Sequence, residues 1–392
     1  MSSTDELPLG EPVDGAPALR PRREEIRGRH VALVPFDPDI HARLLFEATR
    51  GPANERLWAY MGAGPFEDFA SFEAYSRAAA QSEDPLFFAI VDALDGHVLG
   101  HASYMRIDTA NRVIEVGNVL YTPALMRTPA GTEAMYLMAR HAFEVLGYRR
   151  YEWKCNALNA PSRRAAERYG FRFEGVFRHH MIVKGRNRDT AWFSILAEEW
   201  PQRAVAMERW LAADNFDAKG RQIVSLAALN ADRIEVAGAT LRRAQTSDLP
   251  AIEALQKGAY GRNRVLLGVE PLPLTWDYAE VLGEREVWLL DAPGRHAGEA
   301  GIAGVLLLSL RAEDLLVDSL AVAPMAQGGG VGNVLLEAAE ARANALGRTR
   351  VRLYTGEALT ANINWYRRKG FVIERVEQMA DRRLVHLAKS LR

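Results

Sequence analysis

The chain has 392 residues, of which 48% are hydrophobic and 25% charged, and its formal net charge at pH 7 is −1. This length predicts two or three globular domains with complete hydrophobic cores. The balanced charge excludes a broad basic surface for nucleic acid or an anionic membrane, and no run of 18 apolar residues predicts a transmembrane helix.

The first 25 residues are rich in Pro, Gly and charged residues, and we expect them to lack fixed structure. The pattern that follows predicts an N-terminal domain over residues 26–200. In chain order, the expected elements are a strand at 31–35, helices at 38–50 and 69–80, and strands at 87–91, 98–106 and 113–120. A loop then leads into a helix that ends near Gly147, and a strand and a short helix precede Gly170-Phe171.

A glycine-rich loop follows the apolar strand pattern at 315–322. The loop is Gln327-Gly328-Gly329-Gly330-Val331-Gly332, and a helix pattern continues from it to Gly347. A strand, a glycine-rich turn and a helix direct backbone N–H groups toward an anion, and glycine lets a phosphate approach the backbone. The loop lacks the Lys-Ser/Thr of a P-loop, and the next strand, 350–355, does not end on the acidic residue of a dinucleotide site.

The two halves of the chain repeat one order of elements. Gly170-Phe171 and Gly370-Phe371 each lie 23 positions after a helix-ending glycine, Gly147 or Gly347. Each of these glycines lies 15 or 16 positions after the last loop glycine. We therefore expect two copies of one α/β fold, with the second copy over 234–392 and with 201–233 as an appendage of the first copy plus a linker.

Two motifs of the second copy resemble the GNAT superfamily of acyl-CoA-dependent N-acyltransferases. They are the Gln-x-x-Gly-x-Gly loop at 327–332 and the Asn-x-x-x-Tyr-x-x-x-Gly-Phe segment at 362–371. The first copy is similar to the branch that contains the ribosomal-protein N-terminal acetyltransferases, over 127–134, 159–167 and 170–175. The resemblance implies two tandem GNAT folds of α+β type, each a mixed, mainly antiparallel sheet flanked by helices. It also implies acetyl-CoA as donor and a primary amine of a small molecule or peptide as acceptor.

In this family the loop holds the pyrophosphate of coenzyme A, and a backbone N–H in a splayed central strand stabilises the oxyanion. The corresponding residues of the second copy are Leu320, Ala321, Val322, Gln327, Gly328, Gly329, Gly330, Val331, Gly332, Asn333 and Asn362. Those of the first copy are Val119 and Tyr121 in the strand, Arg127, Thr128, Ala130, Gly131 and Thr132 in the loop, and Asn159. Helix capping is the other interpretation of the two asparagines.

Acyl transfer also needs a base for the amine and an acid for the departing thiolate. Asp318 and Glu115, in the strands before the two loops, are the candidate bases, and an exposed strand residue is the other interpretation of each. The resemblance assigns the thiolate to Tyr366, for which a packed core aromatic is the alternative. It assigns Ser162 in the first copy, because Ala166 stands where a tyrosine would be.

The first loop has Met126 in place of Gln327 and Pro129 in place of Gly330. Proline removes one N–H donor, a loss of roughly 1.5–3 kcal/mol for a charged acceptor, while Ala130, Gly131 and Thr132 keep theirs. We therefore expect the second copy to be the better coenzyme A site. Segments 260–263 and 271–278 fall where the family binds acceptors, and an ordinary connection between helices is the other interpretation.

The remaining features predict no metal site and a cytoplasmic protein. The adjacent His179 and His180 would point to opposite faces of a strand, without a third ligand. Cys155 is the single cysteine, which suits a reducing compartment, and no signal-peptide pattern is present. We expect no nucleic-acid or membrane partner, and a homodimer stays open. Two alternatives to an acetyltransferase are a coenzyme A-binding protein with one or both copies silent and a nucleotide-binding protein with an unrelated sheet.

Overall fold

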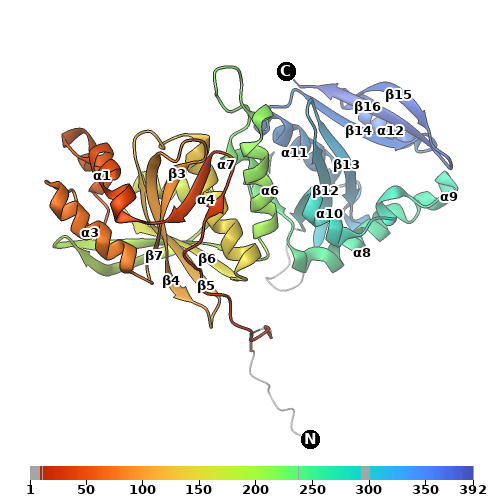
Figure 1. Ribbon diagram of the computed structural model, residues 1–392. Helices are drawn as coiled ribbons and strands as arrows, with labels where there is room; N and C mark the ends of the chain where they lie inside the picture. Colours follow the sequence, from red (N-terminus) through yellow and green to blue (C-terminus); the bar gives the residue numbers. More distant parts are fainter. Residues whose placement is uncertain (1–8, 11, 237, 293–300, 392) are drawn as a thin grey trace, which may run out of the picture. The chain divides into compact units, whose positions relative to one another are not determined.

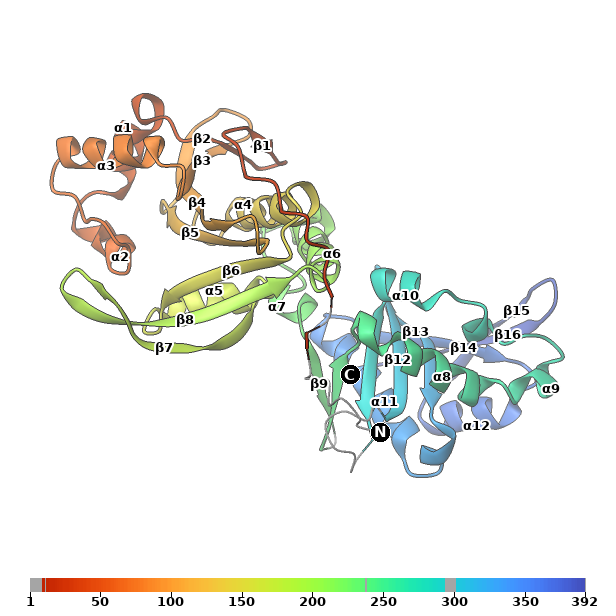
Figure 2. The same ribbon diagram turned by 90° about the horizontal axis from the view of Figure 1, so that it is seen from below.

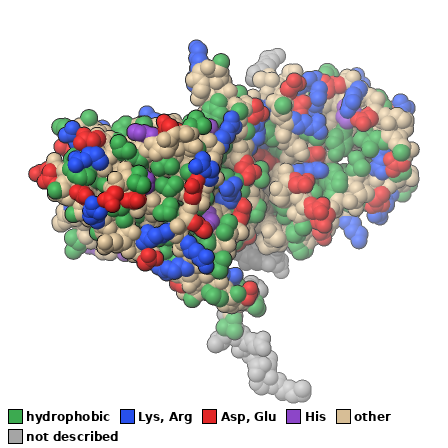
Figure 3. Space-filling view, viewed as in Figure 1, with side chains coloured by type: hydrophobic (Ala, Val, Ile, Leu, Met, Phe, Trp, Pro, Cys, Tyr) green, Lys and Arg blue, Asp and Glu red, His purple; other side chains and the backbone are tan. Residues whose placement is uncertain are grey.

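The computed structural model describes residues 9–10, 12–236, 238–292 and 301–391. The chain forms two compact units (Figure 1). The N-terminal unit comprises Met1–Glu167 and Phe171–Trp200, and the C-terminal unit comprises Arg168–Gly170 and Pro201–Arg392. None of the helices in the described ranges is long and apolar enough to cross a bilayer. Figure 3 shows acidic and basic side chains interspersed on the visible face of each unit.

The N-terminal unit contains an eight-stranded sheet in the order β1-β2-β3-β4-β5-β6-β8-β7. Its strands are β1 (Ile26–Arg27), β2 (Val31–Pro35), β3 (Leu86–Asp92), β4 (Val98–Asp108), β5 (Val113–Tyr121), β6 (Arg150–Asn156), β7 (Arg172–Val183) and β8 (Arg186–Leu196). Its helices are α1 (Pro38–Thr49), α2 (Glu55–Trp58), α3 (Phe69–Gln81), α4 (Pro129–Arg140) and α5 (Ala160–Arg168). All paired neighbours are antiparallel except β5 and β6, which are parallel.

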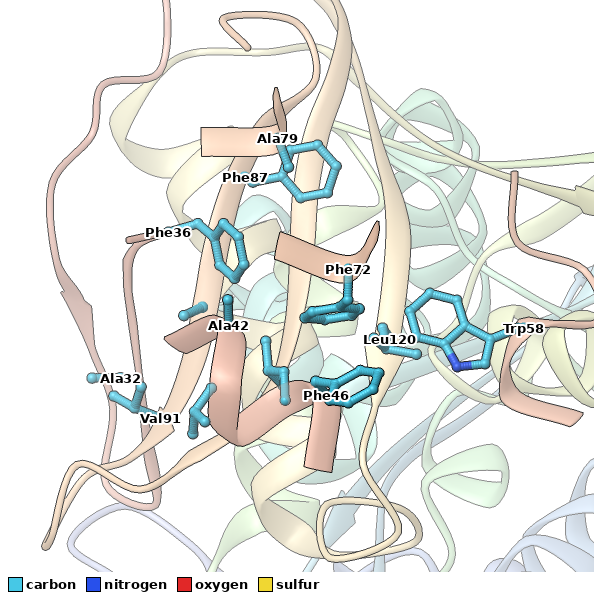
Figure 4. Close-up of a cluster of buried hydrophobic side chains, with 13 residues drawn as sticks. Ala32, Phe36, Ala42, Phe46, Trp58, Phe72, Ala79, Phe87, Val91 and Leu120 are labelled. Carbon is cyan, nitrogen blue, oxygen red and sulfur yellow. The ribbon is translucent and has the colours of Figure 1, made fainter. Parts of the chain in front are cut away.

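Aromatic side chains fill the space between α1, α3 and this sheet. Phe36, Phe46, Phe72 and Phe87 are buried together with Trp58 (Figure 4). Two aspartates fix where the helices begin: the Asp37 side chain accepts from the Asp39 N–H, and the Asp68 side chain accepts from the Ser71 N–H. These helices therefore cover the β2–β4 half of one face of the sheet.

The segment before β1 differs from the expectation of no fixed structure up to residue 25. The Ala18 N–H donates to the Thr109 carbonyl oxygen at 3.0 Å, and the Leu19 N–H donates to the Leu146 carbonyl oxygen at 2.8 Å. Arg23 donates to the Ser82 carbonyl oxygen at 2.8 Å. Backbone partners far along the chain thus hold residues 18–23, which composition alone does not reveal.

The C-terminal unit repeats the same strand order, β9-β10-β11-β12-β13-β14-β16-β15. Its strands are β9 (Arg233–Val236), β10 (Ala239–Arg243), β11 (Glu286–Asp291), β12 (Ile302–Leu310), β13 (Leu315–Val322), β14 (Arg350–Gly356), β15 (Val372–Gln378) and β16 (Arg383–Ser390). Its helices are α6 (Trp200–Leu211), α7 (Leu226–Leu229), α8 (Leu249–Tyr260), α9 (Asn263–Leu267), α10 (Tyr278–Glu284), α11 (Val331–Ala345) and α12 (Thr360–Arg368). Two mixed, mainly antiparallel sheets with flanking helices confirm the predicted duplication.

The two faces of the C-terminal sheet carry different helices. α8 and α10 pack on β11–β13 through a core that includes Ile252, Leu255 and Val281. α11 packs on the other face, where Gly304 of β12 lies against Val331 and Leu335, and Figure 2 shows α11 and α12 on the side opposite α10. On the half of the first face formed by β14, β15 and β16, the short helix α9 lies at the end of β14, where Leu267 lies against Gly356.

Residues 201–233, expected to be an appendage of the first copy and a linker, pack within the C-terminal unit. The buried Arg342 side chain of α11 donates to the Ala228 carbonyl oxygen at 2.5 Å and forms an ion pair with Glu286 at 2.6 Å. Arg203 of α6 forms an ion pair with Asp232 at 2.7 Å. These contacts join residues far apart in the sequence, so the sequence pattern does not reveal them.

In both sheets the two parallel strands separate at equivalent positions. β5 and β6 pair only from Val113 to Val116, and β13 and β14 pair only from Leu315 to Val317. The remaining residues of β5 and β13 have no partner on the parallel side, so the two strands of each pair separate there. A register shift in the β12–β13 pairing also leaves Asp318 as a bulged residue. Each opening leads directly to the loop that follows the strand.

Candidate functional site

The loop after β13 presents unpaired backbone N–H groups. Gly328 and Gly330 adopt left-handed conformations, with φ of 81° and 87°, which favour glycine. The N–H groups of Gly328, Gly330, Val331 and Gly332 have no hydrogen-bond acceptor among the residues that the structure describes. Because two of them belong to the first turn of α11, the loop combines free donors with the positive end of a helix dipole. This arrangement fits an anion such as a pyrophosphate.

The Gln327 side chain connects this loop to β13 and to an arginine. Its Nε2 donates to the Val322 carbonyl oxygen at 3.1 Å, and its Oε1 accepts from Arg262 Nη2 at 2.7 Å. Because glutamine is neutral, the positive charge of Arg262 is not offset by this contact. Arg262 therefore adds a guanidinium beside the loop, although the sequence places it 65 residues earlier and gives no signal for this role.

The loop borders a cavity of about 490 Å³ that extends into the opening between β13 and β14. The predicted residues of the second copy line it, Tyr366 included, except for Gly329, Val331 and Asp318, and Asp318 does not line the second cavity described below either. Gly329 instead donates its N–H to the Ala326 carbonyl oxygen at 3.4 Å. The lining that the sequence did not assign to the cofactor consists of Ala259, Tyr260, Arg262, Asn263, Ala326 and Trp365.

Backbone groups of β13 also face this cavity. The Ala323 N–H donates to β12, and successive residues of a strand present their backbone groups to opposite sides, so Leu320 and Val322 face away from β12. Their carbonyl oxygens accept from side chains that line the cavity: Tyr260 at 3.2 Å and Gln327 at 3.1 Å. The N–H groups of Leu320 and Val322 therefore face the opening, where an oxyanion donor is expected.

Tyr366 of α12 presents a phenol to the same cavity. Its ring packs against Trp365 and Phe371, and it also lines the cavity. Tyr366 is therefore both a packed aromatic residue and a residue of the site, and the two interpretations do not exclude each other. The hydroxyl has no hydrogen-bond partner among the described residues. Burial raises the pKa of Tyr366 well above its ordinary value, so the phenol is protonated at neutral pH. A protonated phenol without a partner is available to donate a proton.

Asp318, the bulged residue of β13, is not an exposed strand residue, so that alternative is wrong. Its side chain is 8% exposed, its Oδ2 accepts from Ser309 Oγ at 2.5 Å, and Arg285 Nη1 lies 3.5 Å from its Oδ1. Burial raises the pKa of the Asp318 carboxyl above its ordinary value, against the opposing effect of Ser309 and Arg285. A carboxylate with a raised pKa is a stronger base than an exposed one.

A second cavity, of about 400 Å³, is lined by residues of β13, β14, β15 and β16 of the same sheet. Leu316 of β13 lines it, whereas Leu320 lines the first cavity, so Asp318 lies between the two along one strand. Of the two segments expected near the acceptor, only 271–278 reaches this cavity, through Leu272. Segment 260–263 lines the first cavity instead, because α8 ends beside the loop.

The loop of the N-terminal unit offers fewer donors than expected. The Gly131 N–H donates to Thr128 Oγ1 at 3.2 Å, and the Gly131 carbonyl oxygen accepts from the Tyr121 hydroxyl at 2.7 Å. The expectation that Gly131 keeps a free donor is therefore wrong, because Thr128 caps α4. β5 nonetheless resembles β13: the Thr122 N–H donates to β4, so Val119 and Tyr121 turn their backbone groups to the opening.

The helices α5 and α12 begin at equivalent positions, Ala160 and Thr360, so Ser162 matches Asn362 and Ala166 matches Tyr366. Asn159 is a cap, because its Oδ1 accepts from the Ser162 N–H at 3.2 Å. Asn362 is not a cap: it lies inside α12 and lines the first cavity. Ser162 Oγ accepts from Trp153 Nε1 at 3.0 Å. The hydroxyl of Ser162 thus already has a partner in its own unit.

Glu115 belongs to a buried cluster of charges around Lys154. Lys154 Nζ lies 3.0 Å from Glu115 Oε2, 2.5 Å from Glu152 Oε2 and 3.7 Å from the centroid of the Trp192 ring. The Lys154 side chain is only 4% exposed. Burial raises the pKa of Glu115, whereas the ammonium of Lys154 opposes this shift. The exposed-residue interpretation of Glu115 is therefore wrong as well.

The strand register shows what this cluster replaces. The last β5–β6 pair is Val116 with Trp153, and the last β13–β14 pair is Val317 with Leu353. Glu115 and Leu316 each precede their pair by one residue, so they are equivalent. Lys154 and Tyr354 each follow their pair by one residue, so they are equivalent too. Leu316 and Tyr354 line the second cavity of the C-terminal unit. The N-terminal unit therefore has its own ammonium and carboxylates where the C-terminal unit has cavity lining.

No group of three His, Cys, Asp or Glu side chains in the described ranges is arranged to hold a metal ion. His180 Nδ1 lies 2.9 Å from Thr190 Oγ1. Cys155 is buried, and burial raises the pKa of its thiol, as expected for a packed side chain rather than a nucleophile.

Two segments match family models described as acetyltransferase (GNAT) domain, over residues 30–172 and 284–373. A solved GCN5-related N-acetyltransferase from Brucella melitensis is 48% identical; the similarity covers 55% of this chain and 97% of that one, with a TM-score of 0.54. YdaF of Bacillus subtilis, named as a candidate ribosomal N-acetyltransferase, is 33% identical over 108 residues, or 27% of this chain and 57% of YdaF. YnaD of the same organism, named as an uncharacterized N-acetyltransferase, is 25% identical over 151 residues, or 38% of this chain and 85% of YnaD.

Replacing Gly330 tests the loop. We expect Gly330→Ala to weaken coenzyme A binding about tenfold in calorimetry, because a Cβ in a left-handed conformation costs roughly 1–2 kcal/mol. Gly347→Ala is the matched control: Gly347 also has a positive φ, 64°, but lies at the other end of α11. Unchanged affinity in Gly330→Ala, or equal losses in both variants, would exclude the loop from the binding site.

Replacing Lys154 tests whether the cluster in the N-terminal unit is structural. Lys154→Met leaves Glu115 and Glu152 without their shared ammonium, and we expect the unfolding free energy of this unit to fall by about 3 kcal/mol. Denaturant titration measures this, with Arg77→Met as control, since Arg77 forms exposed ion pairs with Asp39 and Glu73. Equal stability of the two variants would contradict the interpretation.

Proposed function

Since this chain belongs to the GNAT family of acetyltransferases, we propose that its C-terminal unit transfers the acetyl group of acetyl-CoA to a primary amine of a small molecule or a peptide. One observation carries the proposal. The free N–H groups of Gly328 and Gly330, the inward-facing β13 backbone and the unpartnered Tyr366 phenol meet in a single cavity. Acyl transfer from a thioester requires these groups together with a base for the amine.

Asp318 is the proposed general base. Acceptor amines of the lysine type have a pKa near ~10.4 and are protonated at neutral pH, so a proton must leave before the nitrogen attacks. Asp318 lies on β13 between the two cavities, and its burial strengthens it as a base. The deprotonated nitrogen then forms a C–N bond with the carbonyl carbon of the thioester.

The N–H groups of Leu320 and Val322 are the proposed oxyanion donors. They face the opening because β13 has no parallel partner beyond Val317. Fixed donors stabilise a developing negative charge without reorganisation at the moment of reaction. When the tetrahedral intermediate collapses, the C–S bond breaks and the Tyr366 phenol gives its proton to the thiolate sulfur. The nitrogen, which is positively charged after its attack, loses its second proton, and this proton restores the Tyr366 phenol. The raised pKa of Tyr366 keeps this proton in place at neutral pH.

A second candidate function is coenzyme A binding by a catalytically silent copy, and the N-terminal unit is the copy to which we assign it. Pro129 has no N–H, and the Gly131 N–H is occupied by Thr128. The charge cluster around Lys154 occupies the position of the acceptor cavity. These observations favour acyl transfer in the C-terminal unit.

Tyr366→Phe tests the proton donor. We expect the turnover number to fall about a hundredfold, the lower range for one acid–base group, with acetyl-CoA affinity unchanged. Free-thiol release with a panel of amines gives turnover, and calorimetry gives affinity. Tyr60→Phe, which removes a hydroxyl bonded to the Leu158 carbonyl oxygen in the N-terminal unit, is the control. Full activity of Tyr366→Phe would assign the protonation step, or the reaction itself, elsewhere.

The pH profile tests the base. Burial favours the neutral acid of Asp318, so its pKa is raised, and the ionised fraction grows as pH rises through that pKa. We expect kcat/KM to fall with decreasing pH on the acid limb, with a slope of one and a pKa above the ordinary value of about 3.9. Asp318→Asn should be slow and should lack this limb. The same limb in the variant would belong to another group.

A further inference from the structure

We propose that the acceptor carries an oxyanion, a carboxylate or a phosphate, and that Arg311 binds it at the second cavity. This inference rests on the proposed function, because it names the class of amine used by the same site. It narrows the acceptor to small amines with a negative charge a few bonds from the nitrogen.

The charges around the second cavity leave one arginine without a partner. Glu374 is paired with Arg350 and Arg352, the latter at 3.0 Å. Glu377 is paired with Arg375 at 2.9 Å and with His386 at 2.7 Å.

Arg311 also lines the cavity, and its guanidinium forms no ion pair or hydrogen bond with any described residue, although its positive charge opposes the rise that burial causes in the pKa of the Asp318 carboxyl. A guanidinium whose donors have no hydrogen-bond partner at the rim of a cavity attracts carboxylates and phosphates, whose geometry its planar donors match.

The position of Arg311 relative to the proposed base follows from the strand. Arg311 directly follows β12 and lies two residues after Ser309, so its side chain starts on the same face as the Ser309 hydroxyl that donates to Asp318. Two residues of a strand span roughly 7 Å. The backbone here is fixed, because the Arg311 N–H donates to the Asp314 carbonyl oxygen at 3.0 Å and the Arg311 carbonyl oxygen accepts from Arg348 at 2.9 Å.

The lining of the second cavity suits the carbon skeleton of a small molecule. Leu272, Leu316, Leu353 and Leu384 line the cavity together with Tyr354. A volume of about 400 Å³ holds a small molecule and has no room for a folded partner. Apolar walls also exclude water, which strengthens an ion pair at the rim. A peptide amine has no anion fixed a few bonds away and would leave Arg311 without a partner.

Matched amines separate these classes. The panel comprises β-alanine and γ-aminobutyrate as carboxylates, O-phosphoethanolamine as a phosphate, n-butylamine as an uncharged amine, and a tetrapeptide amide. We expect wild-type kcat/KM to be at least about tenfold higher for one of the anionic amines than for n-butylamine and the peptide, as one charge-assisted contact allows. The ranking of β-alanine against O-phosphoethanolamine identifies the oxyanion.

Arg311→Gln should lower kcat/KM for the preferred anionic amine about thirtyfold, mainly through KM, should change kcat/KM for n-butylamine far less, through the effect of Arg311 on Asp318, and should not change acetyl-CoA affinity. Arg233→Gln, which removes an exposed arginine on the opposite edge strand β9, should change nothing. A preference for the uncharged amine or the peptide, or equal effects of the two variants, would overturn the inference.

A binding measurement keeps this inference separate from the proposed function. If the wild-type protein acetylates no amine, the proposed function fails, and calorimetry with β-alanine and O-phosphoethanolamine then decides the anion site alone. Binding to wild type and Arg233→Gln, with at least tenfold weaker binding to Arg311→Gln, supports the site. Absence of binding to the wild-type protein, or equal binding to all three proteins, overturns it.

Discussion

The loss of pairing between β13 and β14 after Val317 is the constraint on which the candidate site depends. A parallel strand that lost its partner in a packed interior would leave backbone N–H groups unsatisfied, which is unfavourable. Here the unpaired N–H groups of Leu320 and Val322 open into a cavity that continues to the loop. The left-handed Gly328 and Gly330 turn the chain so that the free donors of the loop and of α11 border the same space. The separated end of β13, the glycine loop and the start of α11 thus form one binding surface, which consists of backbone N–H groups.

The two units show how one fold keeps its frame while its sites diverge. Both sheets have the same strand order, the same single parallel pair and an equivalent ion pair between the β6 or β14 start and the following edge strand, Arg150–Glu174 and Arg350–Glu374. The differences lie in side chains that face the openings. In the N-terminal unit, the ammonium of Lys154 is held by two buried carboxylates. The equivalent residue of the C-terminal unit, Tyr354, lines a cavity instead. Such replacements change the chemistry of a site without changing the sheet.

Local patterns were enough to predict the order of the elements, the duplication and the donor loop, because glycine positions and apolar periodicity are local properties. The contacts that complete the site are not local. Arg262 reaches Gln327 across 65 residues, and the burial of Asp318 depends on a bulge, on Ser309 and on Arg285. The capped Gly131 and the packing of residues 201–233 in the C-terminal unit likewise depend on neighbours that no sequence spacing identifies.

Amide hydrogen exchange with and without coenzyme A shows which unit holds the pyrophosphate, because it reports on both loops in one experiment. If the C-terminal opening holds the pyrophosphate, exchange at the amides of residues 328–332 and of Leu320 and Val322 slows when coenzyme A is added. Slowed exchange confined to residues 127–132 of the N-terminal unit, or no change in either loop at saturating coenzyme A, would exclude the C-terminal opening as the pyrophosphate site.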